Sequence, residues 1–538
     1  MGKATRPPAR MIPAARSMSQ GPQPKTRVSI PFPNQGYNPQ AMTPDLILYH
    51  GTCPLGRGIE AVAVRCGRIQ AVGSDRQVLR LRGHGTELLD LSGRPLLPGF
   101  FDSHTHFLAA GLDLTFYIDL SQARCASEAL ALLSRAAQER PGGWVVGRGW
   151  DESTWPERRY LERADLDRAV PRAPACAVRV DGHLVVANTL ALARCGRPDG
   201  ELVDRERGHL WEEAAEELLS CALPDEPTLI QAVGAASKMA AELGITSVAE
   251  MGGQGLLPFQ KAREKGLLCT RVFLYLSQEA LEGLVSLGIG RGLGDELLRI
   301  QGVKLFVDGS IGARTAAVSQ PYLDGEGKGN LLLPRRELAR LLEAAKEAGL
   351  QAAIHAIGDV AIEEAISACE LAGITPGHRF RIEHLELPSK KQLSRMAELG
   401  LVASMQPNFA RRWSGPGGMY QARLGEERDA VIDPHAWALE AGLPLAFGSD
   451  CMPMGPLYGL PGALNPPHEH QRLPLEAALR AYSWGGAYAT FSEGELGELA
   501  PGRWADLVVL SADPKEAPWE EIRVDMTFLA GRAVYQAR

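Results

Sequence analysis

The chain has 538 residues, of which 45% are hydrophobic and 22% are charged, a composition that is ordinary for a soluble globular enzyme. This length is too great for one small core and suits one large α/β barrel with appended parts. No stretch approaches the run of apolar residues that a membrane span needs. The formal net charge of −7 does not indicate binding to nucleic acid.

Residues 1–43 form a leader of unusual composition. They contain six basic residues, eight prolines and no Asp or Glu. They lack the apolar stretch of a secretory signal, and their prolines argue against an amphipathic transit helix. We expect either a disordered leader or a mis-assigned start, and we favour translation from Met42.

Nine cysteines are scattered along the chain without any C-x-x-C pair. This use of cysteine is typical of reduced thiols in a cytoplasmic protein. We expect a small-molecule substrate as the partner, no nucleic acid and no membrane, with a homodimer as one option for the assembly.

Short β-rich runs occur at both ends of the chain. Residues 44–96 alternate such runs with glycine turns, and residues 498–538 do the same. Neither end has enough strands to form a stable domain alone. The simplest prediction is one small β-sandwich that combines the two segments.

Residues 97–497 have a different pattern, in which β-rich runs alternate with helical stretches such as 335–348 and 390–399. This alternation predicts the α/β class and, with eight runs, a (β/α)8 TIM barrel. The runs are 96–106, 245–251, 269–276, 303–308, 351–357, 379–385, 402–407 and 444–450.

The first and second runs are about 140 residues apart. A crossover helix needs far fewer residues, so the gap indicates additional structure. We predict an inserted subdomain at roughly residues 108–229, after the first barrel strand.

Two histidines, His104 and His106, stand one residue apart at the end of the first run, in GFFDSHTHF. Residues i and i+2 of a strand point to the same side, so both imidazoles can face one metal ion at about 2.0–2.1 Å. The pattern alone is weak evidence, because a second His-x-His occurs in the proline-rich stretch PPHEHQ at 466–471.

Further polar residues fall on other runs, toward their C-terminal ends. They are Lys304, His355, His384 and Asp450. Each has a plain structural alternative: a core histidine, a lysine that reaches solvent, or an aspartate that caps a helix. Together with His104 and His106, however, they place six ligand types at the end of the barrel where such enzymes carry their chemistry. We therefore predict a metal centre.

The order HTH, strand lysine, H, H and D resembles the amidohydrolase superfamily, and within it the YtcJ-like branch. The resemblance extends from about residue 45 to residue 535. It is carried by GFFDSHTHF, GRGWDESTW, VDGHLVVAN, VKLFVDGSIGARTA, HAIGD, RIEHLE, SMQPNF, FGSD and PGRWADLVVL.

The resemblance implies a binuclear site with two divalent metal ions, zinc being the expected metal. His104 and His106 would hold the more buried ion together with Asp450, and His355 and His384 would hold the second. Lys304 would bridge both ions as a carbamate, since an ammonium cannot bind a cation. Burial among cations promotes the loss of the lysine proton that this modification requires.

The implied activity is hydrolysis of an amide-type carbon–nitrogen bond other than a peptide bond. N-formyl and N-acyl compounds are candidate substrates. Two metal ions would lower the pKa of a shared water to about 7 and give a metal-bound hydroxide. Asp450 would act as the catalytic base, taking the proton and passing it to the leaving nitrogen.

Residues for substrate binding are harder to assign. His183 and Asp181 lie in VDGH within the predicted insertion, and the resemblance brings this motif to the active site; the alternative is a structural hydrogen bond. Arg314 is suited to a substrate carboxylate or carbonyl, although we prefer a loop-ordering ion pair, for example with Asp308. Trp150 and Trp155 either line an apolar pocket or serve as subdomain core.

Three other functions use the same features. A mononuclear deaminase on this scaffold would need no strand lysine and would hold one metal ion. A metal-dependent isomerase or non-hydrolytic lyase would add no water to its product. A non-catalytic binding protein predicts a missing ligand or base, and no such gap is visible in this sequence.

Overall fold

The computed structural model describes residues 43–55, 58–139, 142–180, 184–196, 199–253 and 255–537. The predicted leader, residues 1–43, lies outside this part of the chain except for Thr43. Within the described residues, no helix combines the length and the apolar composition that crossing a membrane requires.

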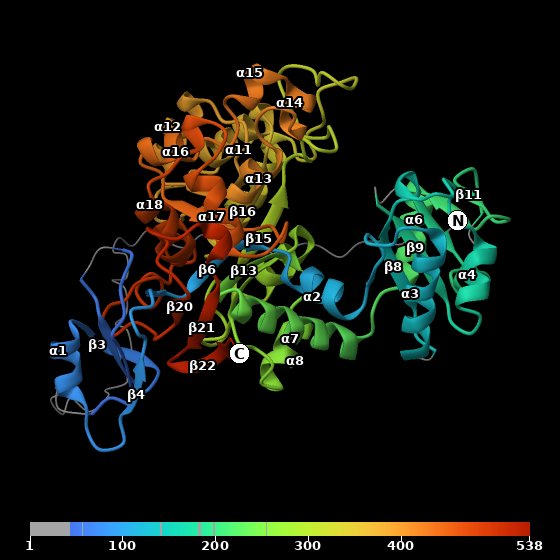
Figure 1. Cartoon of the computed structure of the whole chain (residues 1–538). Helices are drawn as coiled ribbons and strands as arrows, with labels where there is room; N and C mark the ends of the chain where they lie inside the picture. Colours follow the sequence, from blue (N-terminus) through green and yellow to red (C-terminus); the bar gives the residue numbers. More distant parts are fainter. Residues whose placement is uncertain are drawn as a thin grey trace, which may run out of the picture. The chain divides into compact units, whose positions relative to one another are not determined.

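Eight parallel strands form the central sheet and follow one another in chain order around it (Figure 1). Most of these strands are buried along nearly their whole length, which explains why they read as apolar runs rather than as an alternation. The predicted TIM barrel and its eight runs are confirmed. The strands are β6 (Phe100–Thr105), β13 (Ile245–Gly253), β14 (Arg271–Leu276), β15 (Leu298–Phe306), β16 (Gln351–Ala356), β17 (Arg381–His384), β18 (Val402–Met405) and β19 (Leu445–Phe447).

The two largest differences from the predicted runs lie at the starts of β6 and β15. The first run divides at Gly99 into β5 (Leu96–Pro98), which joins a different sheet, and β6 of the barrel. A side chain at Gly99 would meet Thr246 Oγ1 at 2.3 Å, so the close packing at this point leaves room only for glycine. β15 begins at Leu298 rather than at residue 303. The prediction missed its first half because the polar residues Arg299 and Gln301 interrupt the apolar run there.

The barrel closes between its first and last strands through side chains and loop amides. Asp450 N donates to His104 O at 2.8 Å. The Asp102 carboxylate accepts from Ser449 N at 2.8 Å and from Ser449 Oγ at 2.5 Å. These contacts attach the end of β19 to β6 and thereby place Asp450 beside His104.

Helices separate the barrel strands, as predicted. The helix α12 begins after Ser389, which forms a capping box with Gln392, and ends at Gly400 in the left-handed conformation, with φ 65°. The helices before, between and after these strands are α7 (Glu226–Glu242), α8 (Leu257–Glu264), α9 (Leu281–Ser286), α10 (Arg335–Glu347), α11 (Asp359–Leu371), α12 (Lys390–Leu399), α13 (Pro407–Trp413), α14 (Met419–Leu424), α15 (Glu426–Asp429), α16 (His435–Glu440), α17 (Pro456–Leu464), α18 (Leu475–Arg480) and α19 (Gly486–Ala489).

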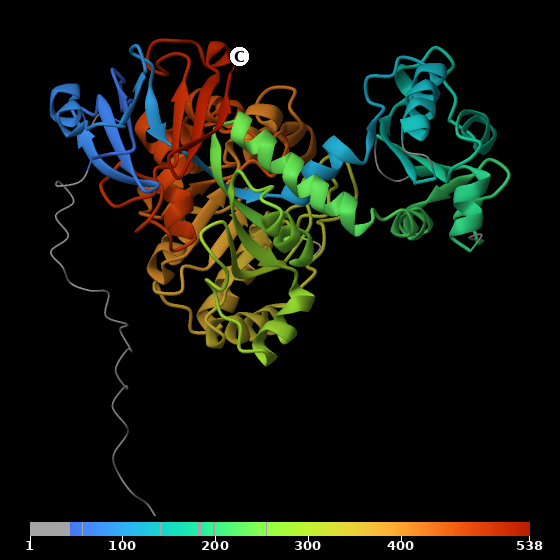
Figure 2. The ribbon, with the colours of Figure 1, turned by 90° about the horizontal axis from the view of Figure 1, so that it is seen from below.

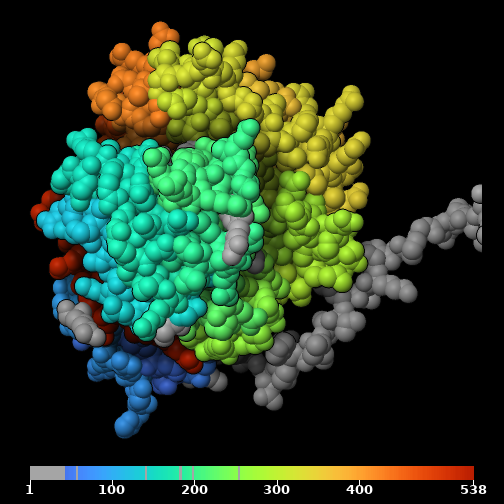
Figure 3. Space-filling view, turned by 90° about the vertical axis from the view of Figure 1, so that its right-hand side faces the viewer, coloured from blue at the N-terminus to red at the C-terminus, as the bar shows by residue number. Residues whose placement is uncertain are grey.

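The long segment between β6 and β13 contains a sheet of its own, in the order β11-β12-β10-β9-β8-β7. It has a separate apolar core that includes Leu133, Val145 and Leu166, and its surface is cyan to green in Figure 3. The helix α2 (Phe107–Thr115), which leads into this segment, packs against α7, which leads out of it. Its elements are β7 (Ile118–Asp119), α3 (Ala126–Glu139), β8 (Val145–Trp150), α4 (Arg163–Ala169), β9 (Ala175–Arg179), β10 (Leu184–Ala187), α5 (Thr189–Arg194), β11 (Val203–Asp204), β12 (His209–Trp211) and α6 (Glu212–Cys221).

Two four-stranded sheets lie side by side at the chain ends (Figure 2). They share one apolar cluster, to which Leu48 and Val62 contribute from one sheet and Leu507 and Phe528 from the other. The exact limits of these parts stay predictions. They are residues 44–96 with 498–538 for the β-sandwich, 97–497 for the barrel and roughly 108–229 for the insertion. The first sheet has β1 (Leu46–Tyr49), β2 (Ala61–Arg65), β3 (Arg68–Gly73) and β4 (Glu87–Asp90); the second has β5, β20 (Leu507–Leu510), β21 (Val524–Leu529) and β22 (Arg532–Gln536).

Candidate metal centre

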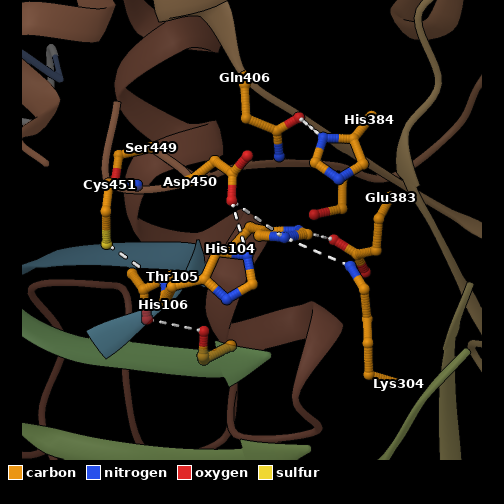
Figure 4. Close-up of polar contacts among 12 residues, drawn as sticks. His104, Thr105, His106, Lys304, Glu383, His384, Gln406, Ser449, Asp450 and Cys451 are labelled. Atoms are coloured by element: carbon orange, nitrogen blue, oxygen red, sulfur yellow. Dashed lines mark hydrogen bonds and ion pairs between the residues drawn. The ribbon is translucent and has the colours of Figure 1, made fainter. Parts of the chain in front are cut away.

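The six residues predicted as metal ligands come from five barrel strands and meet at their C-terminal ends. β6 carries His104, with His106 directly after it, and β17 ends at His384. Figure 4 shows these side chains turned toward a common space together with Lys304 of β15 and Asp450 after β19. The sixth residue, His355 of β16, lies with its ring centroid 4.5 Å from that of His384.

The tightest group is formed by His104, His106 and Asp450. One possible ligand atom from each lies within 4.8 Å of the others. Asp450 Oδ1 is 3.1 Å from His106 Nε2 and 3.6 Å from His104 Nε2. The same oxygen is buried and has no aligned hydrogen-bond donor among the described residues. An unsatisfied carboxylate oxygen facing two imidazole nitrogens is a donor set that fits a divalent cation.

Lys304, His355 and His384 stand beside this group. Lys304 Nζ is 3.3 Å from His104 Nε2, and the ring centroids of His104 and His384 are 4.6 Å apart. The structure therefore brings all six predicted side chains together. His355 and His384 lie next to the group of three rather than within it.

Burial changes the protonation of His104, His355, His384 and Lys304 in the direction that metal binding requires. It lowers the pKa of His104 and His384 well below the usual value, and that of His355 to about 3. The imidazoles are therefore neutral, which is the ligating form. Burial also lowers the pKa of Lys304 to about 8, which eases the proton loss that a carbamate needs.

Each of the three buried imidazoles is held by a hydrogen bond through one ring nitrogen. Glu383 Oε2 lies 2.6 Å from Nδ1 of His104, and Gln406 Oε1 lies 2.9 Å from Nδ1 of His384. The backbone oxygen of Gly309 lies 3.0 Å from Nε2 of His355. Such contacts orient the ring and leave its other nitrogen for the centre.

Glu383 is itself held by a buried arginine. Arg381 is fully buried, and its Nε lies 2.7 Å from Glu383 Oε1. Arg381 Nη2 also donates to Ser103 O and, at 2.8 Å, to Ser404 Oγ. This network fixes the carboxylate that orients His104. Glu383 and Gln406 were not among the predicted site residues. In the sequence each is marked only as a polar residue inside or just after a buried strand.

The loop that carries Asp450 has a strained backbone. Asp450 and Cys451 have positive φ angles of 53° and 57°, and His384 has φ 70°. Residues other than glycine seldom adopt such angles, and they concentrate at functional sites. A side chain at Gly448 would come within 2.4 Å of His104 N, which explains the glycine in FGSD.

Arg314 and Asp308 do not form the ion pair that we considered. Arg314 Nε and Nη2 each lie 3.0 Å from the carboxylate of Asp324. Asp308 instead accepts hydrogen bonds from backbone amides, among them those of Ile357 and Gly358 at 3.1 and 2.9 Å. This second role is visible only in the fold, because it joins the loop after β15 to the loop after β16.

The other residues considered for substrate binding have separate outcomes. Trp150 is fully buried in the core of the insertion, with its ring centroid 5.7 Å from that of Trp155, and it does not line the cavity described next. This placement agrees with the alternative role in the subdomain core. Asp181 and His183 lie outside the described residues.

A cavity of about 320 Å³ opens beside the predicted ligands. Five of the six line it, and His104 lies fully buried beneath them. The cavity therefore gives a small molecule access to the group. The other lining residues are Phe306, Ser310, Ile311, Gly312, Ile357, Glu386, Phe409, Trp413, Met419, Tyr420 and Met452.

The barrel with its added sheets, and the cluster of imidazole, amine and carboxylate groups at the strand ends, define a metal-dependent hydrolase. Residues 87–535 match the model of the amidohydrolase family. The chain therefore belongs to the amidohydrolase family, which confirms the resemblance found in its sequence.

Several relatives match most of the chain. The Bacillus subtilis protein YtcJ is 28% identical, and the match covers 89% of this chain and 97% of YtcJ. The N-substituted formamide deformylase of Arthrobacter pascens is also 28% identical, with 86% of this chain and 92% of the deformylase covered. A solved structure of an uncharacterized metal-dependent hydrolase from Pyrococcus furiosus has a TM-score of 0.79 at 31% identity, and covers 87% of this chain and 99% of that one.

Proposed function

We propose that this protein hydrolyses a carbon–nitrogen bond of the amide type in a small molecule, with the help of bound metal ions. The observation that carries the proposal is the convergence of four imidazoles, one buried lysine and Asp450 beside one cavity. Similarity to an N-substituted formamide deformylase supports N-formyl and N-acyl amides as the first substrates to test.

The metal ligands follow from the donor set. We assign His104, His106 and Asp450 to one ion, and His355 and His384 to a second; Lys304, as a carbamate, would bind both. Nitrogen and carboxylate ligands of this kind suit zinc. The unsatisfied Oδ1 of Asp450 supports the assignment, because a cation would satisfy it. When bound, the ions would polarise a carbonyl group and make a water molecule more acidic.

The residues of the chain have distinct tasks in the proposed reaction. Asp450 accepts a proton from the attacking water as the water oxygen bonds to the carbonyl carbon. The same proton then passes to the nitrogen as the carbon–nitrogen bond breaks. An amine and a carboxylic acid result, with formic acid as the acid from a formamide. Glu383 and Gln406 keep the imidazoles in position during these steps.

A substrate screen with metal analysis tests the proposal. Protein produced with zinc is incubated with N-formyl and N-acyl amines, and amine release is measured with and without a chelator. We expect amine release that stops when metal is removed, and two zinc ions per chain. Release of ammonia by protein with one ion would favour a deaminase, and a rearranged product without added water would favour an isomerase. No turnover of any amide by fully loaded protein would contradict the proposal.

A further inference from the structure

His106 differs from the other three imidazoles of the candidate metal centre in how its ring is held. The rings of His104, His355 and His384 are buried, and each has a hydrogen-bond partner outside the six predicted ligands. The side chain of His106 is 43% exposed, and among the described residues its ring has one polar partner, Asp450, with 3.1 Å between Nε2 and Oδ1. The position of this ring therefore depends on the backbone that carries it.

That backbone lies at the point where β6 ends and the helix α2 begins. His106 is the residue directly before the first turn of α2. The first amides of a helix have no partner within the helix, and the side chain at this position usually supplies an acceptor. The side chain of His106 makes no such hydrogen bond. An imidazole that faces the metal centre cannot also cap the helix, so the acceptor must come from another part of the chain.

Glu250 on the neighbouring strand β13 supplies the acceptor. Its side chain is buried, with 2% of its surface exposed, and Oε2 accepts a hydrogen bond from the backbone amide of Phe107, the first residue of α2. The carboxylate also accepts from the amide of Leu108. The strand register places Glu250 opposite Thr105 of β6. A carboxylate at this end of a helix is favourable because the helix dipole is positive there.

Two further contacts hold the same turn. The amide of His106 donates to Cys451 Sγ at 3.3 Å (Figure 4), and Thr105 Oγ1 donates to Ala249 O at 3.0 Å. Together with the bond from Phe107 to Glu250, they attach three consecutive residues to β13 and to the loop after β19. The turn is thus fixed without any contribution from the ring of His106.

We infer that Glu250 is a positioning residue for His106: it caps α2 from the neighbouring strand and thereby holds the imidazole toward one metal ion. The inference deepens the proposed function and rests on it, because that function assigns the ion to His106. Among the described residues, the group of possible ligands around His106 consists of His104, His106 and Asp450. Glu250 therefore acts through the backbone and not as a ligand. Contacts behind a metal-binding residue commonly determine how tightly the metal is held.

Two variants of Glu250 separate its role as an acceptor from its charge. Glu250→Met has a side chain of similar length but leaves the amide of Phe107 without an acceptor. Glu250→Gln loses the charge and keeps one oxygen that can accept this bond. Titration of the zinc-loaded proteins with a chromogenic chelator gives the affinity for each zinc ion. Glu250→Met should bind one ion about 10–100-fold more weakly and keep its affinity for the other, whereas Glu250→Gln should lose no more than about threefold for either ion.

A third variant covers the case in which Glu250→Met does not fold. Glu250→Asp keeps the charge, but its side chain is shorter by one methylene group, so the carboxylate is drawn back from the amides of α2. It should show the same selective loss of one zinc ion. The melting temperature of each variant, measured without metal, shows whether the protein is folded.

Loss of a helix cap also lowers stability, so a cap at another helix is the matched control. Asp225 is exposed and directly precedes α7, the helix that packs against α2, and its carboxylate accepts from Thr228 N at 3.0 Å. Asp225 belongs neither to the ligand group nor to the cavity lining. Asp225→Ala should lower the melting temperature and leave both zinc affinities unchanged.

The outcomes distinguish this inference from the proposed function. Unchanged zinc affinities in Glu250→Met and Glu250→Asp overturn the inference. An equal loss in Glu250→Gln also overturns it, because charge and not the hydrogen bond would then matter. An equal loss in Asp225→Ala does the same, because helix stability would then explain the effect. Selective weakening of one ion in a protein that hydrolyses no amide supports the inference but contradicts the proposed hydrolysis. An unmodified protein that binds no zinc contradicts both.

Discussion

Asp450 combines three features that seldom occur together in one residue. It has a positive φ angle, a buried oxygen without an aligned donor, and a position beside two imidazoles. The strained backbone is maintained by neighbouring contacts, including the hydrogen bond from Asp450 N to His104 O. Such strain is retained where it places a functional group.

The first prediction concerns Asp450→Asn. The amide has a similar shape but cannot accept a proton, so turnover should fall by about 10²–10⁴-fold while the protein stays folded. Steady-state kinetics on the best amide substrate, with circular dichroism as the control for folding, measure this. Unaltered turnover would refute the role of Asp450 as the base.

The second prediction concerns Lys304→Ala. If Lys304 binds both metal ions as a carbamate, the variant should lose bound metal as well as activity. Elemental analysis after gel filtration measures the metal, and Lys391→Ala, at an exposed lysine of α12, is the matched control. Metal content equal to that of the unmodified protein would show that the bridging assignment is wrong.

At the level of elements, the centre is held by contacts between strands that are far apart in the chain. Glu383 on β17 orients His104 on β6, and 279 residues separate them. Asp102 and Ser449 likewise join the two strands at which the barrel closes. The positions of His104 and Asp450 therefore depend on contacts with other strands.

The third prediction concerns the link between β17 and β6. In Glu383→Gln the side chain keeps its size but loses its charge, and it also leaves the buried Arg381 without its ionic partner. Metal affinity should fall by about 10–100-fold, which is typical when the carboxylate behind a metal-binding histidine is changed. Competition with a chromogenic chelator measures the affinity. An unchanged affinity would mean that Glu383 does not act through His104.

The strands and the convergence of the six candidate side chains could be predicted from sequence because buried parallel strands are apolar runs and their C-terminal ends lie on one face. The contacts behind the ligands could not be predicted in this way. Glu383 and Gln406 each have a partner on a different strand, and no local pattern marks such a pair. The predicted ion-pair partner of Arg314, Asp308, was wrong for the same reason. Asp324 and Asp308 are equally plausible partners in the sequence, and the structure shows Asp324.

At the scale of the whole molecule, the terminal sheets and the barrel are joined by a buried ion pair. Arg271 begins β14 and Asp506 directly precedes β20, and two contacts of 2.6 and 3.0 Å connect them. Both side chains are almost completely buried. Asp506 also accepts from the backbone amide of Ala530, so one carboxylate joins three segments.

The fourth prediction concerns this ion pair. Arg271→Met leaves the Asp506 carboxylate buried without its partner, which should lower the free energy of unfolding by about 3–5 kcal/mol. Urea unfolding measures the change. Replacing both partners, with Arg271→Met and Asp506→Leu, should restore part of the loss because no unpaired charge remains. A single variant as stable as the original protein would contradict the importance of this link.

Anomalous diffraction at the zinc edge, from crystals of active zinc-loaded protein, tests the central claim most directly. The account predicts two peaks at the mouth of the barrel, one among His104, His106 and Asp450 and one beside His355 and His384, with density for a carbamate on Lys304. The absence of any peak among these six side chains in fully active protein would contradict it.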